Sequence, residues 1–448
     1  MAAQPEQLPD RRQHDPTLEA RYQSHTPRPV PKGVFRSIGL GLITGAADDD
    51  PSAIGTYASA GAKYGTSLLW LVPFLYPMMF AVVYLSSKIG QVTGQGLFGV
   101  IKQHYPRWLL HFALVGMVLG NTIEAAADLG GMAAAMNLIV PIPHSWLVIG
   151  LTTSMLLLQF YGSYTLIRNI FRSLALALLA YLGSALLAKP EVGSVIRGTL
   201  VPTIHLNRDF LAMMLAIIGT SLSAYLYTWQ SNQDVEEDIS MGRRRLIDRI
   251  GTTREELSHS ARDIAFGMFF SALVMYFIVL STAATLFKAH ITEISTAAQA
   301  AQALAPLAGK AAGLLFAVGL IGVGFIAVPV MTTGAAYDLC QTFGWPHGLH
   351  KSPKQCREFY ISIAIVTMIA MAMNFFGMNP MRALVWAGIV QGFSTPFLML
   401  MVMLITNKRK IMGRWVNSPY LNLLGWITTI AVSAVSLGLL ASWFFSPK

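Results

Sequence analysis

Long apolar segments recur along the whole 448-residue chain and constrain its fold more than any other feature. A run of about 18 to 20 apolar residues is long enough to cross a bilayer as an α-helix. Eleven such segments occur, at approximately residues 37–60, 66–88, 109–138, 144–162, 171–188, 209–230, 264–287, 311–338, 358–378, 383–406 and 422–445. Charged residues make up only 12% of the chain, against about 25% in a soluble domain. The sequence therefore predicts an all-α polytopic membrane protein embedded in a lipid bilayer, and it excludes a soluble enzyme.

The placement of basic residues predicts the orientation of these spans. With the N-terminus in the cytoplasm, 24 of the 32 Lys and Arg residues fall on the cytoplasmic side and 8 on the other. Basic residues concentrate on the cytoplasmic side of membrane proteins. We therefore expect a cytoplasmic N-terminus, an external C-terminus and a place in the bacterial inner membrane. This distribution accounts for the net charge of +10, and it argues against a nucleic-acid partner because no reader motif accompanies it.

The first span carries three consecutive acids and a proline, Asp48-Asp49-Asp50-Pro51, in an otherwise apolar segment. Proline removes a backbone donor and clashes with the preceding turn, so we expect the helix to break here. Unwound backbone at membrane depth persists where it lines a cavity, and transporters build ion sites from such breaks. The alternative interpretation is a simple loop that joins two short helices.

A cluster of Gly, Thr and Ser likewise interrupts the sixth span, between residues 219 and 230. If the chain consists of two halves of five spans each, spans one and six correspond to each other. Interrupted segments in corresponding positions indicate a transport site. The alternative is that these small residues form a helix-packing face.

Acidic residues occur in two further places along the spans. Glu124 and Asp128 are four residues apart in the third span, so they share one helical face, which Asn121 extends. Carboxylates at this depth can relay protons or hold a cation, although a buried polar patch satisfied by neighbouring helices is the alternative. Asp338, near the end of the eighth span, and the acidic run 234–238 are predicted to be solvated helix ends.

These segments resemble the Nramp family of divalent-metal transporters. The family's first-span signature is Asp-Pro-Gly-Asn, followed by Ala-Gly-Ala-x-[Phe/Tyr]-Gly; here DPSA at 50–53 is followed at the same distance by AGAKYG at 60–65. In the sixth span, SAY at 223–225 stands where the family has Met-Pro-His. Asp128 falls on the family's acidic position in the third span. The resemblance covers residues 34–406.

The resemblance implies a LeuT-type fold, in which two inverted repeats of five helices are followed by an eleventh transmembrane helix. Residues 1–33 lack an apolar core, and this composition predicts a disordered cytoplasmic arm. The remaining chain is expected to divide into a transport core (34–406) and a linker with the last helix (407–448). The resemblance also implies alternating access, with no cofactor other than the transported ion. The metal ligands that the resemblance implies are Asp50, Ala53, Thr220 and Ser223, and the pathway residues are Asp49, Glu124, Asp128, Tyr225 and Trp229.

Three departures from the family pattern concern the substrate. Ala53 replaces an asparagine, Ser223 a methionine and Tyr225 a histidine. The thioether that favours soft metals is lost, whereas Mg2+ keeps several waters and needs only one or two carboxylates. The pattern resembles the divergent magnesium-transporting branch of the family, so Mg2+ is the expected substrate and Mn2+ a second one. Without the histidine, tight proton coupling is not expected.

Other functions remain open at this point. A proton-coupled Mn2+/Fe2+ symporter and an amino-acid or organic-cation transporter would use the same scaffold. An intramembrane enzyme, in which Asp48 to Asp50 with Glu124 would hold a catalytic metal, is set aside because no histidine or second paired acid motif accompanies them. The two cysteines, Cys340 and Cys356, are predicted to be packing residues. The sequence leaves the oligomeric state open.

Overall fold

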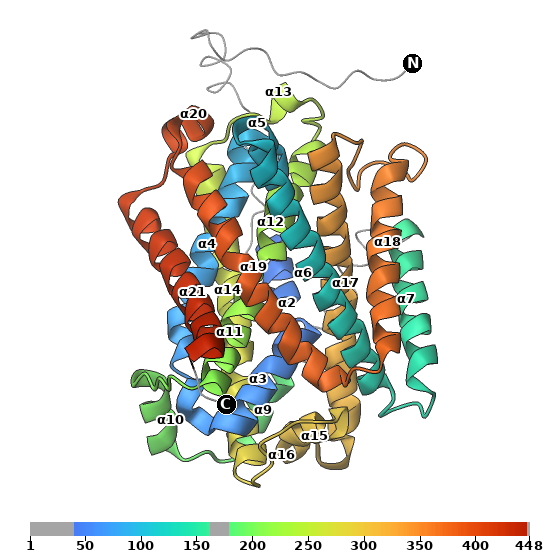
Figure 1. Cartoon of the computed structure of the whole chain (residues 1–448), viewed down its shortest axis with the longest axis vertical. Helices are drawn as coiled ribbons and strands as arrows, with labels where there is room; N and C mark the ends of the chain where they lie inside the picture. Colours follow the sequence, from blue (N-terminus) through green and yellow to red (C-terminus); the bar gives the residue numbers. More distant parts are fainter. Residues whose placement is uncertain (1–39, 162–178, 446–448) are drawn as a thin grey trace.

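The computed structural model describes residues 40–161 and 179–445. The predicted arm at 1–33 and part of the predicted fifth span at 171–188 lie outside the described residues. The described part is nearly all helical, and its helices form one bundle (Figure 1). They are α2 (Leu40–Asp48), α3 (Pro51–Tyr64), α4 (Leu71–Thr93), α5 (Leu97–His104), α6 (Arg107–Met136), α7 (His144–Tyr161), α9 (Ala180–Leu187), α10 (Val192–Leu200), α11 (Arg208–Ser221), α12 (Ala224–Ser240), α13 (Leu246–Arg249), α14 (Arg254–Thr282), α15 (Ala297–Ala301), α16 (Ala305–Ala308), α17 (Ala312–Phe343), α18 (Arg357–Met373), α19 (Pro380–Thr406), α20 (Arg409–Met412) and α21 (Pro419–Phe445).

Eight helical segments of the described chain are long and apolar enough to cross a membrane. They coincide with spans two, three and six to eleven of the sequence prediction. The predicted first span is divided between α2 and α3, and the fourth corresponds to the 18-residue helix α7. The chain is therefore an integral membrane protein built from helices, as predicted.

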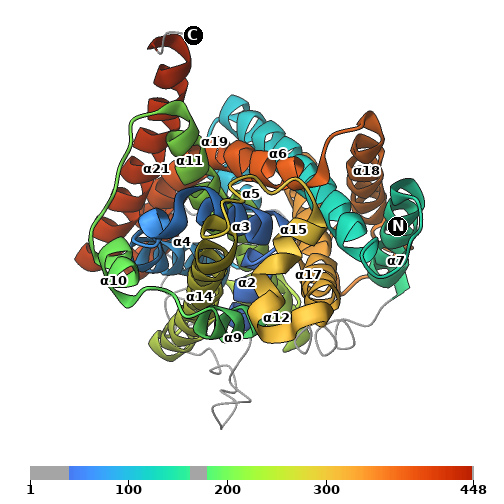
Figure 2. The ribbon, with the colours of Figure 1, turned by 90° about the horizontal axis from the view of Figure 1, so that it is seen from below.

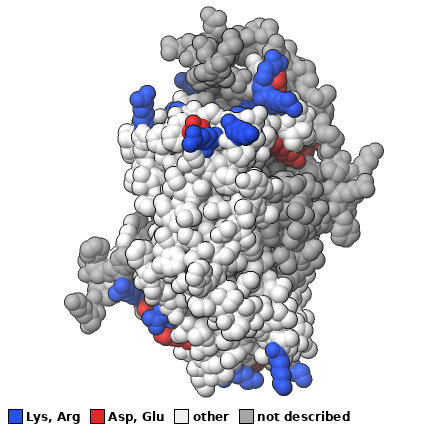
Figure 3. Space-filling view, turned by 90° about the vertical axis from the view of Figure 1, so that its right-hand side faces the viewer, with Lys and Arg blue, Asp and Glu red and all other residues white. Residues whose placement is uncertain are grey.

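The surface of the bundle fits a membrane environment. On the face drawn in Figure 3, Lys, Arg, Asp and Glu side chains gather toward the two ends, with a broad uncharged band between them. Large apolar side chains on the outer helices are exposed, among them Phe112 on α6, Ile365 on α18 and Ile430 on α21. Contact with water would be unfavourable for such apolar side chains, whereas contact with lipid is not.

The break predicted in the first span is present. α2 ends at Asp48 and α3 begins at Pro51, which occupies the first helical position. Proline is well tolerated there because its missing N–H would have no partner inside the helix. Asp50 is the N-cap, and its side chain accepts the N–H of Ala53 over 2.7 Å. The same sequence therefore ends one helix and starts the next.

The sixth span is also broken, between Ser221 at the end of α11 and Ala224 at the start of α12. No proline causes this break. Instead, neighbouring groups satisfy the carbonyl oxygen of Leu222, which accepts the hydroxyls of Tyr227 (2.5 Å) and Thr395 on α19 (3.1 Å). A broken helix at membrane depth requires such partners for its freed backbone groups.

Glycines let the broken helices pack closely against their neighbours, and Figure 2 shows α2 and α3 near the centre of the bundle. A Cβ at Gly219 on α11 would lie 2.0 Å from the carbonyl oxygen of Gly388 on α19. A Cβ at Gly45 on α2 would lie 2.2 Å from the carbonyl oxygen of Gly267 on α14. Both contacts are backbone against backbone, so any larger residue would push the helices apart.

The predictions of solvated helix ends are wrong for three acids. Asp234 and Asp238 of the run 234–238 are 1% and 0% exposed, and Asp338 on α17 is 0% exposed. The reason is tertiary, because α12 and α17 pack against each other and against α5. Asp238 is paired with Arg243 at 2.9 Å. Cys340 and Cys356 are both buried free thiols, in agreement with a packing role.

Candidate functional site

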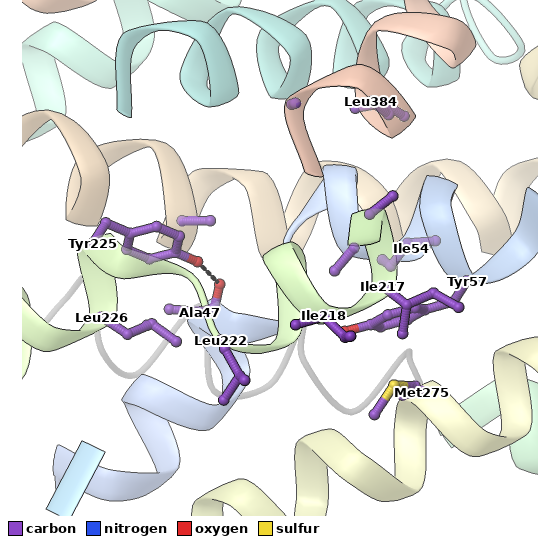
Figure 4. Packing of buried hydrophobic residues seen from close by; sticks show 14 of the residues in the cluster. Ala47, Ile54, Tyr57, Ile217, Ile218, Leu222, Tyr225, Leu226, Met275 and Leu384 are labelled. Carbon is purple, nitrogen blue, oxygen red and sulfur yellow. Dashed lines mark hydrogen bonds between the residues drawn. The ribbon is translucent and has the colours of Figure 1, made fainter. Parts of the chain in front are cut away.

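Tyr225 connects the two helix breaks. Its hydroxyl, in the first turn of α12, donates to the carbonyl oxygen of Ala47 at the end of α2 over 2.6 Å (Figure 4). The same hydroxyl lies 3.2 Å from Oδ2 of Asp50. All three residues are completely buried. The unwound segments of spans one and six therefore meet around a single carboxylate in the interior of the bundle.

Apolar side chains close the junction toward α11 and α14. Ile217 and Ile218 of α11 lie beside Tyr57 of α3, with Met275 of α14 below them in Figure 4. The Tyr57 hydroxyl forms a hydrogen bond of 2.8 Å with the hydroxyl of Ser221. This packing keeps water away from the junction and strengthens electrostatic interactions there.

Asp50 is held by the start of its own helix. Its Oδ1 accepts the N–H of Ala53 and the hydroxyl of Ser52, each over 2.7 Å. Its Oδ2 faces Tyr225 on the other broken helix. The N–H groups at the N-terminus of α3 carry a partial positive charge, which favours an anion at this position. The carboxylate thus has a fixed orientation, with one oxygen directed at its own helix and the other at the junction.

The two acids of α6 face the same helix start. Oδ1 of Asp128 accepts the N–H of Ser52 over 2.9 Å, and Oε1 of Glu124 lies 3.3 Å from the Ser52 hydroxyl. Oε1 of Glu124 also lies 3.4 Å from the hydroxyl of Ser223, and its Oε2 accepts the side-chain amide of Gln391 on α19 over 2.5 Å. Both acids are completely buried. Neighbouring helices provide hydrogen bonds to part of this patch, but Oδ2 of Asp128 has no hydrogen-bond partner within 40–161 and 179–445.

The predicted ligands Thr220 and Ser223 lie in and beside the second break. The Thr220 hydroxyl donates back to the carbonyl oxygen of Ala216 over 3.0 Å. The carbonyl oxygen of Thr220 accepts the hydroxyl of Ser223 over 3.0 Å. Ala53 lies in the first turn of α3 and contributes its N–H to Asp50. Asp50, Ala53 and Ser223 are thus within one connected hydrogen-bond network with the acids of α6.

Two predicted pathway residues lie apart from this network. Asp49 is directed at α14, where the hydroxyl of Ser271 lies 3.1 Å from its Oδ1 and 2.6 Å from Oδ2 of Asp48. Trp229 is buried on α12, one helical turn beyond Tyr225, at 6% exposure. No hydrogen bond links either residue to Asp50 in the described part of the chain.

The site offers carboxylate, hydroxyl and carbonyl oxygens, and its carboxylates are not paired with a described Lys or Arg side chain. Among the described residues, no Lys or Arg forms an ion pair with Asp50, Glu124 or Asp128. Buried carboxylates without a counter-ion are unstable unless a cation or protons neutralise them. No group of three His, Cys, Asp or Glu side chains in the described residues could hold a metal alone. A cation at Asp50 would therefore also need hydroxyls, carbonyls or water as ligands.

A second cluster ties the helices together at the end of the bundle where α13 lies, here called the α13 end. Oε1 of Glu236 on α12 accepts the hydroxyl of Tyr337 on α17 (2.6 Å) and the N–H of Leu349 (3.0 Å). Its Oε2 lies 2.9 Å from Nδ1 of His350. α12, α17 and the segment that follows α17 are thereby joined at this end.

Three residues of the site escaped the sequence-based reasoning: Ser52, Gln391 and Ser271. Ser52 follows Pro51 in the signature, in place of the glycine of the Nramp pattern, so this departure was the signal. Gln391 is a polar amide in the apolar span 383–406, and such a residue indicates a partner inside the membrane. No sequence feature distinguishes Ser271 from other small residues that pack between helices.

Two helices broken near mid-length and apposed around a buried carboxylate are the arrangement of the LeuT fold class. The fold is similar to a solved structure of the manganese transporter of Eremococcus coleocola, with a TM-score of 0.70 and 16% identity, covering 94% of this chain and 91% of that chain. It is also similar to MhsT in complex with L-phenylalanine, with a TM-score of 0.57 and 13% identity, covering 90% and 98%. The predicted LeuT-type fold is confirmed.

The chain belongs to the Nramp family, because the family described as natural resistance-associated macrophage protein-like matches residues 41–442. A similar relative is the divalent metal cation transporter MntH of Deinococcus radiodurans, which is 28% identical over 416 residues and covers 91% of this chain and 90% of its own length. Members of this family are transporters, so this chain is a transporter and not an enzyme, as predicted.

Proposed function

We propose that this transporter moves divalent metal cations across the bacterial inner membrane by alternating access, with Mg2+ as the main substrate and Mn2+ as a second one. One observation carries the proposal. The buried carboxylate of Asp50 lies where the two broken helices meet, and the side chains joined to it by hydrogen bonds offer oxygen atoms, from Ser52, Tyr225 and the acids of α6. Oxygen ligands suit hard divalent cations such as Mg2+.

The comparisons support the substrate class. The named relative is a divalent metal cation transporter, and a solved structure of similar fold is a manganese transporter. An amino acid, which MhsT binds in its solved structure, is disfavoured in this chain. Its carboxylate would be repelled by the carboxylates of Asp50, Glu124 and Asp128, which no described basic residue neutralises.

Asp50 is the principal ligand in this proposal, and the carbonyls near Ala53 and Thr220 and the hydroxyl of Ser223 assist it, partly through water. The absence of a thioether at Ser223 favours Mg2+ over softer metals. Tyr225 and Trp229 line the route toward the α13 end, and Asp49, Glu124 and Asp128 supply negative charge that attracts the cation.

We infer further that transport proceeds without tight proton coupling. Tyr225 occupies the position at which the Nramp pattern has histidine, and a tyrosine hydroxyl does not exchange protons at neutral pH. The membrane potential alone suffices as a driving force, since a divalent ion crossing roughly 100 mV gains about 4.6 kcal/mol. The α13 end carries the basic run 243–262 and is the cytoplasmic side in this proposal.

Transport assays in proteoliposomes test the proposal. Uptake of Mg2+, Mn2+, Ca2+ and a panel of amino acids is compared for the wild type, Asp50→Ala and Asp209→Ala. Asp209 is a matched control because its carboxylate is exposed and pairs with Lys63 at 2.9 Å, away from the breaks. We expect Asp50→Ala to abolish metal uptake and Asp209→Ala to leave it unchanged. Normal Mg2+ uptake by folded Asp50→Ala would refute the ligand assignment, and uptake of an amino acid instead of metal would refute the function.

A further inference from the structure

Asp338 on α17 is the one buried acidic side chain of the described residues in which both carboxylate oxygens lack a hydrogen-bond partner. It has no exposed surface. Burying a carboxylate in this way is strongly unfavourable unless something neutralises or ligates it. No Lys or Arg of the described chain pairs with it. The site around Asp50 does not use this residue.

Two further polar side chains face the same stretch of α17. The hydroxyl of Thr228 on α12 lies close to the Asp338 carboxylate. It donates to the carbonyl oxygen of Tyr225 over 3.1 Å, so its lone pairs remain available as a ligand. Asn121 on α6 donates its amide to the carbonyl of Met331 over 3.3 Å, but its buried Oδ1 has no hydrogen-bond partner in the part of the chain that the structure describes.

Gly334 provides space between these side chains. It precedes Asp338 by four residues, so the two share one face of α17. A Cβ at Gly334 would lie 3.6 Å from the Thr228 hydroxyl and 4.0 Å from the Asn121 amide nitrogen. The hydroxyl of Thr228 and the side-chain amide of Asn121 thus both lie against the bare face that Gly334 leaves on α17, the face that also carries Asp338.

The position of this group relative to Asp50 follows from the chain. Thr228 lies one turn beyond Tyr225 on α12, which runs toward the α13 end. Asn121 lies one turn before Glu124 on α6, which begins at the same end. Tyr225 and Glu124 both contact the Asp50 network. The group of Asn121, Thr228 and Asp338 is therefore one helical turn from the main site, in the direction of the α13 end.

We propose that Asn121, Thr228 and Asp338 form a second cation site, which holds a partly hydrated divalent cation in transit between Asp50 and the α13 end. This inference rests on the proposed function, because it assumes that the cation bound at Asp50 leaves by this route. The donor set is one carboxylate and two neutral oxygens. Such a site binds hard divalent cations weakly, with a dissociation constant of about millimolar order, as a transit site requires.

Mn2+ alone, followed by electron paramagnetic resonance, is the probe for this site. The spectrum of the detergent-solubilised full-length chain distinguishes bound from free Mn2+. We expect the wild type to bind two ions, one of them weakly, and Asp338→Asn to bind only the tighter one. Thr228→Val, which keeps the side-chain shape, should lower the affinity for the second ion by roughly tenfold or more. The control is Asp209→Asn, which removes an exposed carboxylate and should keep both ions.

The outcomes separate this inference from the proposed function. If Asp338→Asn and Thr228→Val both keep two bound ions, or if the wild type binds a single ion that Asp50→Ala removes, the second site is refuted and the main site stands. If Asp50→Ala keeps both ions while Asp338→Asn loses one, the second site stands and the ligand assignment of Asp50 fails. Should Asp338→Asn be poorly folded, Thr228→Val decides, because it removes a ligand and no charge.

A transport measurement adds a readout that a purely structural role would not move. We expect Asp338→Asn to lower the maximal rate of Mn2+ uptake. The KM for Mn2+ that enters from the side opposite the α13 end should stay within about twofold, because the substitution leaves binding at Asp50 unchanged. Asp338→Glu, which keeps the charged ligand, should restore the rate. Equal loss in Asp338→Asn and Asp338→Glu would overturn the proposal.

Discussion

Replacing Tyr225 with phenylalanine tests whether one hydroxyl holds the two helix breaks together. The hydroxyl donates to the Ala47 carbonyl over 2.6 Å and approaches Asp50 at 3.2 Å, and all three residues are fully buried. The substitution leaves the Ala47 carbonyl without this partner in a site closed to water. Removing one partner of a buried hydrogen bond costs about 1–3 kcal/mol. We therefore expect Tyr225→Phe to lower the free energy of unfolding by about 2 kcal/mol.

The matched control is Tyr181→Phe. Tyr181 on α9 is also buried, but its hydroxyl has no hydrogen-bond partner among the described residues. The same chemical change there removes no bond. Equilibrium unfolding of both variants in mixed micelles gives the comparison. If Tyr225→Phe and Tyr181→Phe lose the same free energy, to within about 0.5 kcal/mol, the hydroxyl does not stabilise the junction and the reasoning fails.

Three further predictions concern substrate, coupling and gating. Ser223→Met combined with Ala53→Asn should shift preference from Mg2+ toward Mn2+ or Cd2+ in competition assays, because it restores a soft ligand; unchanged relative affinities would contradict this. Metal uptake into vesicles that contain a pH-sensitive dye should proceed without acidification of the lumen. Acidification that disappears in Glu124→Gln/Asp128→Asn would show instead that these acids carry protons. Glu236→Gln should weaken the contacts to a tyrosine, a backbone amide and a histidine at the α13 end, raising the accessibility of α12 to thiol reagents at introduced cysteines; wild-type labelling rates would exclude this role.

The sequence alone determined where most of the spans lie and where the first of them breaks. Hydropathy places most of the spans because the bilayer requires long apolar helices. The break at Asp50-Pro51 is local chemistry, since a proline after an N-capping aspartate starts a new helix. The Nramp signature then identified the family, and with it the LeuT-type fold. These features depend on residues that are adjacent in the chain.

Only the tertiary structure decided which polar groups meet. Glu124 and Gln391 are 267 residues apart and share a hydrogen bond, and Tyr225 reaches Ala47 across 178 residues. Asp338 looked like a solvated helix end because its sequence neighbours end a span, yet helices distant in sequence bury it completely. Burial of a polar side chain is a property of what packs over it. No local pattern encodes that, so the group around Asp338 becomes visible only when α6, α12 and α17 are brought together.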